Sequence, residues 1–106
     1  MRWIGITVGA LALTGCGAVI PRVTPQLVEA ARQRDPTLDE QMLERVRSLY
    51  VNRCSSCHSL NDPRDYTAQE WPEWMRKMAK KSKLGSADEH RLLVFVLTAR
   101  EMPLPP

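Results

Sequence analysis

The sequence shows no strand-like alternation of apolar and polar residues, no internal repeat and no low-complexity tract. The missing alternation excludes a sheet as the main element. The formal charge of +3 is too small to indicate a nucleic-acid protein, and no Lys/Arg run alternates with aromatics. A length of 106 residues leaves room for one small domain, which we expect to be all-α.

The N-terminus carries the features of an export signal. Arg2 supplies a positive charge, and the apolar stretch Trp3–Leu13 is too short to span a bilayer comfortably. The tetrapeptide that ends at Cys16 resembles the bacterial lipobox, whose Cys receives a diacylglyceryl group before cleavage. We therefore predict a signal peptide over 1–15, lipidation of Cys16 and an exported lipoprotein facing the periplasm or extracytoplasmic space. The alternatives are an ordinary secretory signal and a short transmembrane anchor.

Gly17 follows the predicted lipidated Cys and, by the convention of such lipoproteins, favours the outer membrane if the host is Gram-negative. The next residues contain Pro21, Pro25 and Pro36, so 16–36 is predicted to be an anchor and tether. A short helix over Gln26–Arg34 is compatible with this segment, because Thr24 can cap it and Pro25 suits its first position.

The domain proper is predicted over 37–106, with helices that begin at three capping-box patterns headed by Thr37, Thr67 and Ser86. Pro72 makes the start of the second helix ambiguous by a few residues. The expected helices cover about 38–52, 67–84 and 86–100, followed by an extended proline-rich tail. Helical spacing predicts that they bury Met42, Val46, Leu49, Tyr50, Trp71, Trp74, Met75, Met78, Leu92, Leu93, Val96 and Leu97.

Cys54-Ser-Ser-Cys57-His58 is a C-x-x-C-H motif, the signature of c-type haem attachment. Two thiols at this spacing can reach the two vinyl groups on one porphyrin edge, and His58 can then ligate the iron from below. A thioredoxin-like pair would need an α/β fold, and a zinc site would need further ligands, of which His90 is the best candidate. A structural disulfide is the third alternative. With Cys16 assigned to lipid, covalent haem c through Cys54 and Cys57 is the favoured interpretation.

From Leu49 onward the chain resembles a small bacterial monohaem cytochrome c of the class I kind. The resemblance covers Thr37 to Arg100, and Trp71-Pro72 followed by Met78 is similar to a W-P-x(5)-M segment of small lipoprotein cytochromes. It implies His/Met ligation and one-electron transfer. The chain departs from larger members in that Met78 follows His58 by only 20 positions. It also has Phe95 where many members carry Tyr or Trp.

Met78 is accordingly predicted to be the distal iron ligand, so that His58 and Met78 together bind the metal. Met75 lies one turn earlier on the same face and is the main rival. His90 is expected to be exposed, and Met102 lies in the tail. A thioether ligand would raise the haem potential, whereas an open sixth position would allow O₂, CO or peroxide to bind.

Five cations occupy the methionine-bearing helix and its exit without an acidic residue among them. They could be a solvated face or a docking patch that steers an acidic redox partner. Their positions are Arg76, Lys77, Lys80, Lys81 and Lys83.

The predicted function is electron transfer without transformation of a substrate, so the chain is not expected to be an enzyme. Its predicted partners are acidic redox proteins and, through the lipid, a membrane, with no nucleic acid. The alternatives are a haem-based gas or redox sensor and a small cytochrome subunit of a larger oxidoreductase.

Overall fold

The computed structural model describes residues 18–54 and 60–103, and within these ranges the regular elements are all helical. They are α1 (Pro25–Arg34), α2 (Glu40–Arg53), the 3₁₀ turn η1 (Pro63–Asp65), α3 (Trp71–Lys81) and α4 (Ser86–Ala99). The all-α expectation is confirmed for this part of the chain, with four α-helices where about three were expected. No helix among these residues is both long and apolar enough to cross a membrane.

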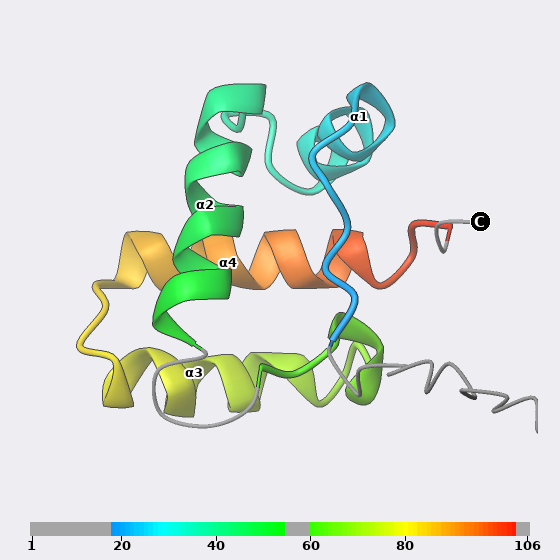
Figure 1. Cartoon of the computed structure of the whole chain (residues 1–106). Coiled ribbons are helices and arrows are strands. Elements are labelled where there is room, and N and C mark those ends of the chain that lie inside the picture. Colours follow the sequence, from blue (N-terminus) through cyan, green and yellow to red (C-terminus); the bar gives the residue numbers. More distant parts are fainter. Residues whose placement is uncertain (1–17, 55–59, 104–106) are drawn as a thin grey trace, which may run out of the picture.

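Helix α4 is the centre of the fold. α1, α2 and α3 all contact it, with α2 crossing it and α3 running beneath it in Figure 1. From its middle to its C-terminus, α4 is apolar on nearly every side, and Leu92, Phe95 and Val96 are fully buried. The ring of Phe95 lies 6.2 Å from that of Tyr50 on α2. A helix with so little polar surface is stable only when neighbours cover it, and three other helices do so here.

Helix α1 changes the expected domain organisation, because it belongs to the packed unit. Thr24 caps it by accepting from the Leu27 N–H at 3.2 Å, and Pro25 occupies its first turn, as the sequence predicts. Leu27 and Ala31 are completely buried, and the helix packs on α4. A tether over 16–36 is therefore incorrect for 25–34, since burying these side chains stabilises the helix against the core. The packed unit begins before Thr37.

The helix starts differ from the predicted capping boxes. The Asp39 side chain caps α2 by accepting from the Met42 N–H at 2.8 Å, while Thr37 donates to Asp35 instead. Gly85 is the N-cap of α4, which leaves Ser86 inside the first turn. The capping box headed by Thr67 does form, in the turn just before α3. The Thr67 N–H donates to the Glu70 carboxylate at 2.9 Å, and the Glu70 N–H donates to the Thr67 hydroxyl at 3.1 Å.

The predicted buried faces are largely confirmed on α2, α3 and α4. Trp74 is the main exception, since it remains 38% exposed. Four predicted core residues are only partly buried, namely Met42, Leu49, Leu93 and Leu97. Leu43 and Phe95 are fully buried although the helical spacing did not single them out.

Candidate functional site

Cys54 lies where α2 ends. Its N–H donates to the Tyr50 carbonyl at 3.2 Å, so the last turn of the helix places it, and its side chain is only 6% exposed. The first Cys of the C-x-x-C-H motif is therefore held by the end of a helix, as the sequence predicts. Cys57 and His58, like the predicted lipidation site Cys16, lie outside the described residues.

The chain that returns from the motif is fastened to two helices. The buried Tyr50 hydroxyl donates to the carbonyl oxygen of Asn61. The Trp71 indole Nε1–H donates to the Pro63 carbonyl at 2.7 Å, and this bond is buried. Because a buried donor left without its acceptor is costly, these two bonds fix where the chain passes after the motif. Sequence spacing gave no sign of either bond.

The Tyr50 hydroxyl stays protonated, and so can donate a hydrogen bond, across the physiological pH range. Burial raises the pKa of its phenol well above the ordinary value, and the nearby Cys54 and the acidic Asp62 act in the same direction. The protonated hydroxyl is therefore always available to the Asn61 carbonyl.

The turn after the motif is the expected source of an acceptor for the ring N–H of His58. Within it, the carbonyls of Asn61, Asp62 and Pro63 already accept from Tyr50, the Asp65 N–H and Trp71. Each carbonyl keeps a second lone pair. A bond from His58 to this turn stays a prediction and would make one of these oxygens a double acceptor.

Met78 borders a cavity of about 250 Å³ between α3 and the chain that follows the motif. Asn61 and Tyr66 line one side, while α3 contributes Trp74 and Met78 together with two lysines. Met78 is 8% exposed, whereas Met75 is 1% exposed, lies in the core and does not line this cavity. Of the two candidate methionines, Met78 is thus the one whose side chain lines the cavity between α3 and the chain that follows the motif.

Aromatic rings form one wall of this cavity. Tyr66 stacks on Trp74 with ring centroids 4.8 Å apart and meets the edge of Trp71 at 5.1 Å. Such stacked and edge-to-face pairs add about 0.5–1.5 kcal/mol beyond the area that the rings bury and so favour this arrangement of the wall. Tyr66 lies in a segment that the sequence marks only as loop, so its place in the wall could not be predicted.

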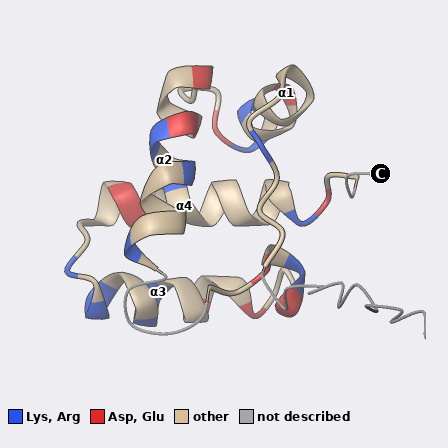
Figure 2. Cartoon of the chain, viewed as in Figure 1, with Lys and Arg blue, Asp and Glu red and all other residues tan. Residues whose placement is uncertain are grey.

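The five predicted docking cations are all exposed on α3 and the turn after it. Lys77 pairs with Glu73 at 3.5 Å and lies 5.3 Å from the Trp74 ring centroid. Arg53, at the end of α2, joins them by donating to the Ser82 carbonyl at 2.8 Å. We call Arg53, Arg76, Lys77, Lys80, Lys81 and Lys83 the basic surface, which Figure 2 shows in blue at one end of α3 and beside it.

His90 is exposed, as expected, and its Nε2 lies 3.0 Å from an Asp35 carboxylate oxygen. This pair connects the start of α4 to the end of α1. Hydrogen bonds from Thr37, and then the contact with His90, lower the pKa of Asp35. Among the described residues, no three His, Cys, Asp or Glu side chains gather into a group that could hold a metal ion.

The chain matches no family model, no curated protein and no solved structure.

Proposed function

We propose that this chain is a membrane-anchored carrier of single electrons with one covalent haem c. Cys54 and Cys57 would hold the porphyrin, His58 would be the proximal ligand and Met78 the distal ligand. The observation that carries the proposal is the position of Met78, whose thioether lines a cavity beside the residues that follow C-x-x-C-H.

Two of the described residues are suited to hold such a group. Cys54 is buried at a helix end, and Met78 is presented by a second helix across the returning chain. A bound haem would supply an iron that changes between ferric and ferrous states, with a potential raised by thioether ligation and burial. The cavity of about 250 Å³ at Met78 is smaller than a usual cofactor site, so residues 55–59, which lie outside the described residues, would have to contribute the rest of the site.

The chain's own residues would hold the ligands in place. Tyr50 and Trp71 fix the returning chain on the proximal side through their bonds to Asn61 and Pro63. Tyr66 and Trp74 would form a stacked wall beside the Met78 side chain, while Met75 stays buried in the core. A pre-arranged site that keeps both ligands in place during electron transfer is what a carrier needs, whereas a gas sensor needs an iron position that can open.

The N-terminal part of the proposal is export followed by lipidation at Cys16, with the folded domain in the periplasm or extracytoplasmic space. The basic surface would then meet an acidic redox partner, because complementary charge speeds encounter at low salt. The same arrangement would serve a small cytochrome subunit within a larger oxidoreductase.

The test is a pyridine haemochrome spectrum of membrane-extracted protein, followed by ferric and ferrous spectra of Met78→Ala and Met75→Ala. We expect thioether-linked haem in all three, and loss of the ferric methionine–iron band with new CO binding in Met78→Ala alone. Met75→Ala is the matched control, because it removes a methionine from the same helix.

Three results would overturn parts of the proposal. Absence of covalent haem would remove the function altogether. Loss of the methionine–iron band in Met75→Ala alone would transfer the distal role to Met75. CO binding by the unmodified ferrous protein would indicate a sensor.

A further inference from the structure

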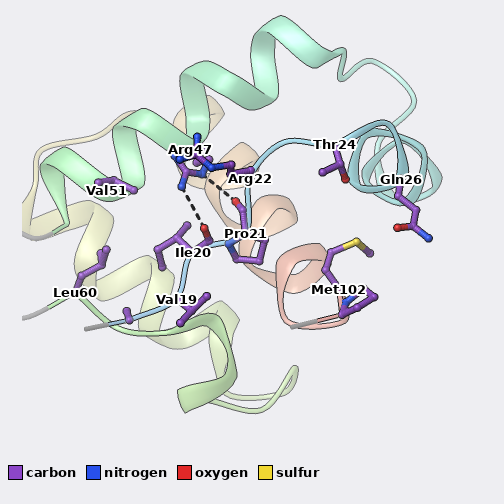
Figure 3. Close-up of a pocket in the computed structure, with 12 residues that line it drawn as sticks. Val19, Ile20, Pro21, Arg22, Thr24, Gln26, Arg47, Val51, Leu60 and Met102 are labelled. Carbon is purple, nitrogen blue, oxygen red and sulfur yellow. Dashed lines mark hydrogen bonds between the residues drawn. The ribbon is translucent and has the colours of Figure 1, made fainter. Parts of the chain in front are cut away.

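The residues between the predicted lipid anchor and α1 are bound to the domain. Arg47 on α2 donates through Nε to the Pro21 carbonyl at 2.8 Å and through Nη2 to the Ile20 carbonyl at 3.1 Å (Figure 3). The Val19 N–H donates to an Asp62 carboxylate oxygen at 3.1 Å. We call residues 18–22 the clasp, because side chains from α2 and from the turn before η1 hold it at both ends.

A large cavity lies along the clasp. Its volume is about 710 Å³, and Val51, Leu60 and Met102 line it together with Val19 and Ile20 of the clasp (Figure 3). Val19 is one of two large apolar side chains that are exposed among the described residues. Arg22 lies at the border of the same cavity. An apolar hollow edged by arginine suits the boundary between lipid headgroups and acyl chains, where the arginine can reach phosphate.

The predicted anchor at Cys16 is too close to the clasp to let the domain move far from the membrane. Cys16 precedes Ala18, the first described residue of the clasp, by two positions. Two extended residues span at most about 7 Å. A lipid on Cys16 would therefore bring a bilayer to the edge of the cavity, since the clasp itself is bonded to the domain.

We propose that the clasp and its cavity form a membrane-contacting face that seats the domain on a phospholipid bilayer in one orientation. The inference rests on lipidation of Cys16, which is part of the proposed function. Met102 and Pro103 come from the far end of the sequence but line the same cavity. Met102 and Pro103 would therefore reach the bilayer only if the clasp holds the whole face that carries the cavity against the membrane.

The orientation leaves the basic surface accessible. In Figure 1 the clasp and η1 lie toward one end of α3, while the exit of α3, with Lys80, Lys81 and Lys83, lies at the other end. A domain seated on its clasp would direct these lysines away from the bilayer, toward a soluble acidic partner.

The test uses full-length, haem-loaded, lipidated protein in vesicles that contain a phospholipid with a photoreactive diazirine on its acyl chain. After irradiation, mass spectrometry maps labelled peptides and reads the acylation of Cys16 in the same sample. We expect label on the clasp and on the Met102–Pro103 peptide, and only background on the peptide that covers 76–83.

Two variants separate the clasp from simple proximity to the anchor. Arg47→Ala should reduce labelling of Met102–Pro103 to background, while Arg45→Ala, an exposed neighbour on α2, should label like the unmodified protein. If Arg47→Ala fails to fold, a Gly/Ser insertion of about a dozen residues between Gly17 and Ala18 replaces it. Such an insertion leaves every clasp contact in place but adds a reach of about 20 Å, so Met102–Pro103 should again fall to background.

The outcomes distinguish the two proposals. Acylated Cys16 with label confined to the clasp, or spread equally onto 76–83, overturns the seated orientation while leaving the lipid anchor intact. Labelling of Met102–Pro103 that survives both Arg47→Ala and the insertion overturns the role of the clasp. A Cys16 without acyl chains overturns the lipid anchor itself and this inference with it.

Discussion

Helices α3 and α4 run side by side but use their surfaces in opposite ways. α4 buries six of its residues, and all the other α-helices pack on it. α3 buries a single stripe that contains Trp71, Met75 and Met78, and it turns cations outward on the other side. The difference is consistent with a division of roles in which α4 holds the fold together and α3 carries the proposed distal ligand and the proposed recognition surface. Substitutions on the two helices should therefore differ in which property they change.

The largest effect is expected at the centre of α4. Phe95→Ala removes a fully buried ring and should lower the free energy of unfolding by about 3–5 kcal/mol. The exposed Arg76→Ala on α3 is the control and should change it by less than about 0.5 kcal/mol. Urea unfolding followed by circular dichroism measures both. Similar losses for the two variants would contradict the assignment of α4 as the structural centre.

Charge reversal on α3 should alter kinetics far more than stability, because the two lysines in its last turn interact with the helix dipole by only about 0.3–1 kcal/mol each. Lys80→Glu combined with Lys81→Glu is expected to slow electron transfer to an acidic carrier about tenfold at low ionic strength, and to flatten the salt dependence. Stopped-flow kinetics at several salt concentrations gives both quantities. Arg34→Glu with Arg45→Glu, two exposed arginines outside the basic surface and the clasp, is the matched control. Unchanged kinetics in the lysine variant would reduce the basic surface to a solvated face.

The smallest effect is expected at the exit of α3, where two lysines should respond with opposite signs. Lys83 has a positive φ of 57°, a conformation that costs less for Gly, and the Leu84 N–H closes the turn on the Ala79 carbonyl at 2.9 Å. Lys83→Gly should raise the free energy of unfolding by about 0.5–1 kcal/mol. Lys81→Gly, at the last residue of the helix, should lower it instead, because Gly is a poorer helix former than Lys. Thermal unfolding of the two variants measures both changes. A lower free energy of unfolding in both would contradict the argument from the positive φ of Lys83.

Local patterns predicted the helices well where one face had to be buried. The spacing of Trp71, Met75 and Met78 placed them on the buried stripe of α3, because helical periodicity depends only on positions along the chain. Trp74 satisfied the same spacing but stayed partly exposed, since it stacks on Tyr66 at the rim of the cavity. Capping was predicted less well. Asp39 and Gly85 took positions assigned to Thr37 and Ser86, because neighbouring residues compete for the same backbone N–H groups.

The candidate site was predictable only in part. The C-x-x-C-H motif is contiguous, so Cys54, Cys57 and His58 could be proposed as haem-binding residues from the sequence. The bonds from Tyr50 to Asn61 and from Trp71 to Pro63 join residues that are 11 and 8 positions apart, with no spacing rule between them. Arg53 joined the basic surface for the same reason, through a carbonyl on the turn after α3.

The sequence by itself determined the helical class, the C-x-x-C-H motif as a haem hypothesis and the run of cations, because each depends on residues close together along the chain. Only the tertiary structure placed Met78 rather than Met75 at the cavity, drew α1 into the core and bound residues 18–22 to Arg47 and Asp62. These three features depend on which helix faces meet and on which distant groups complete each other's hydrogen bonds. Neither is encoded in the spacing of a single segment.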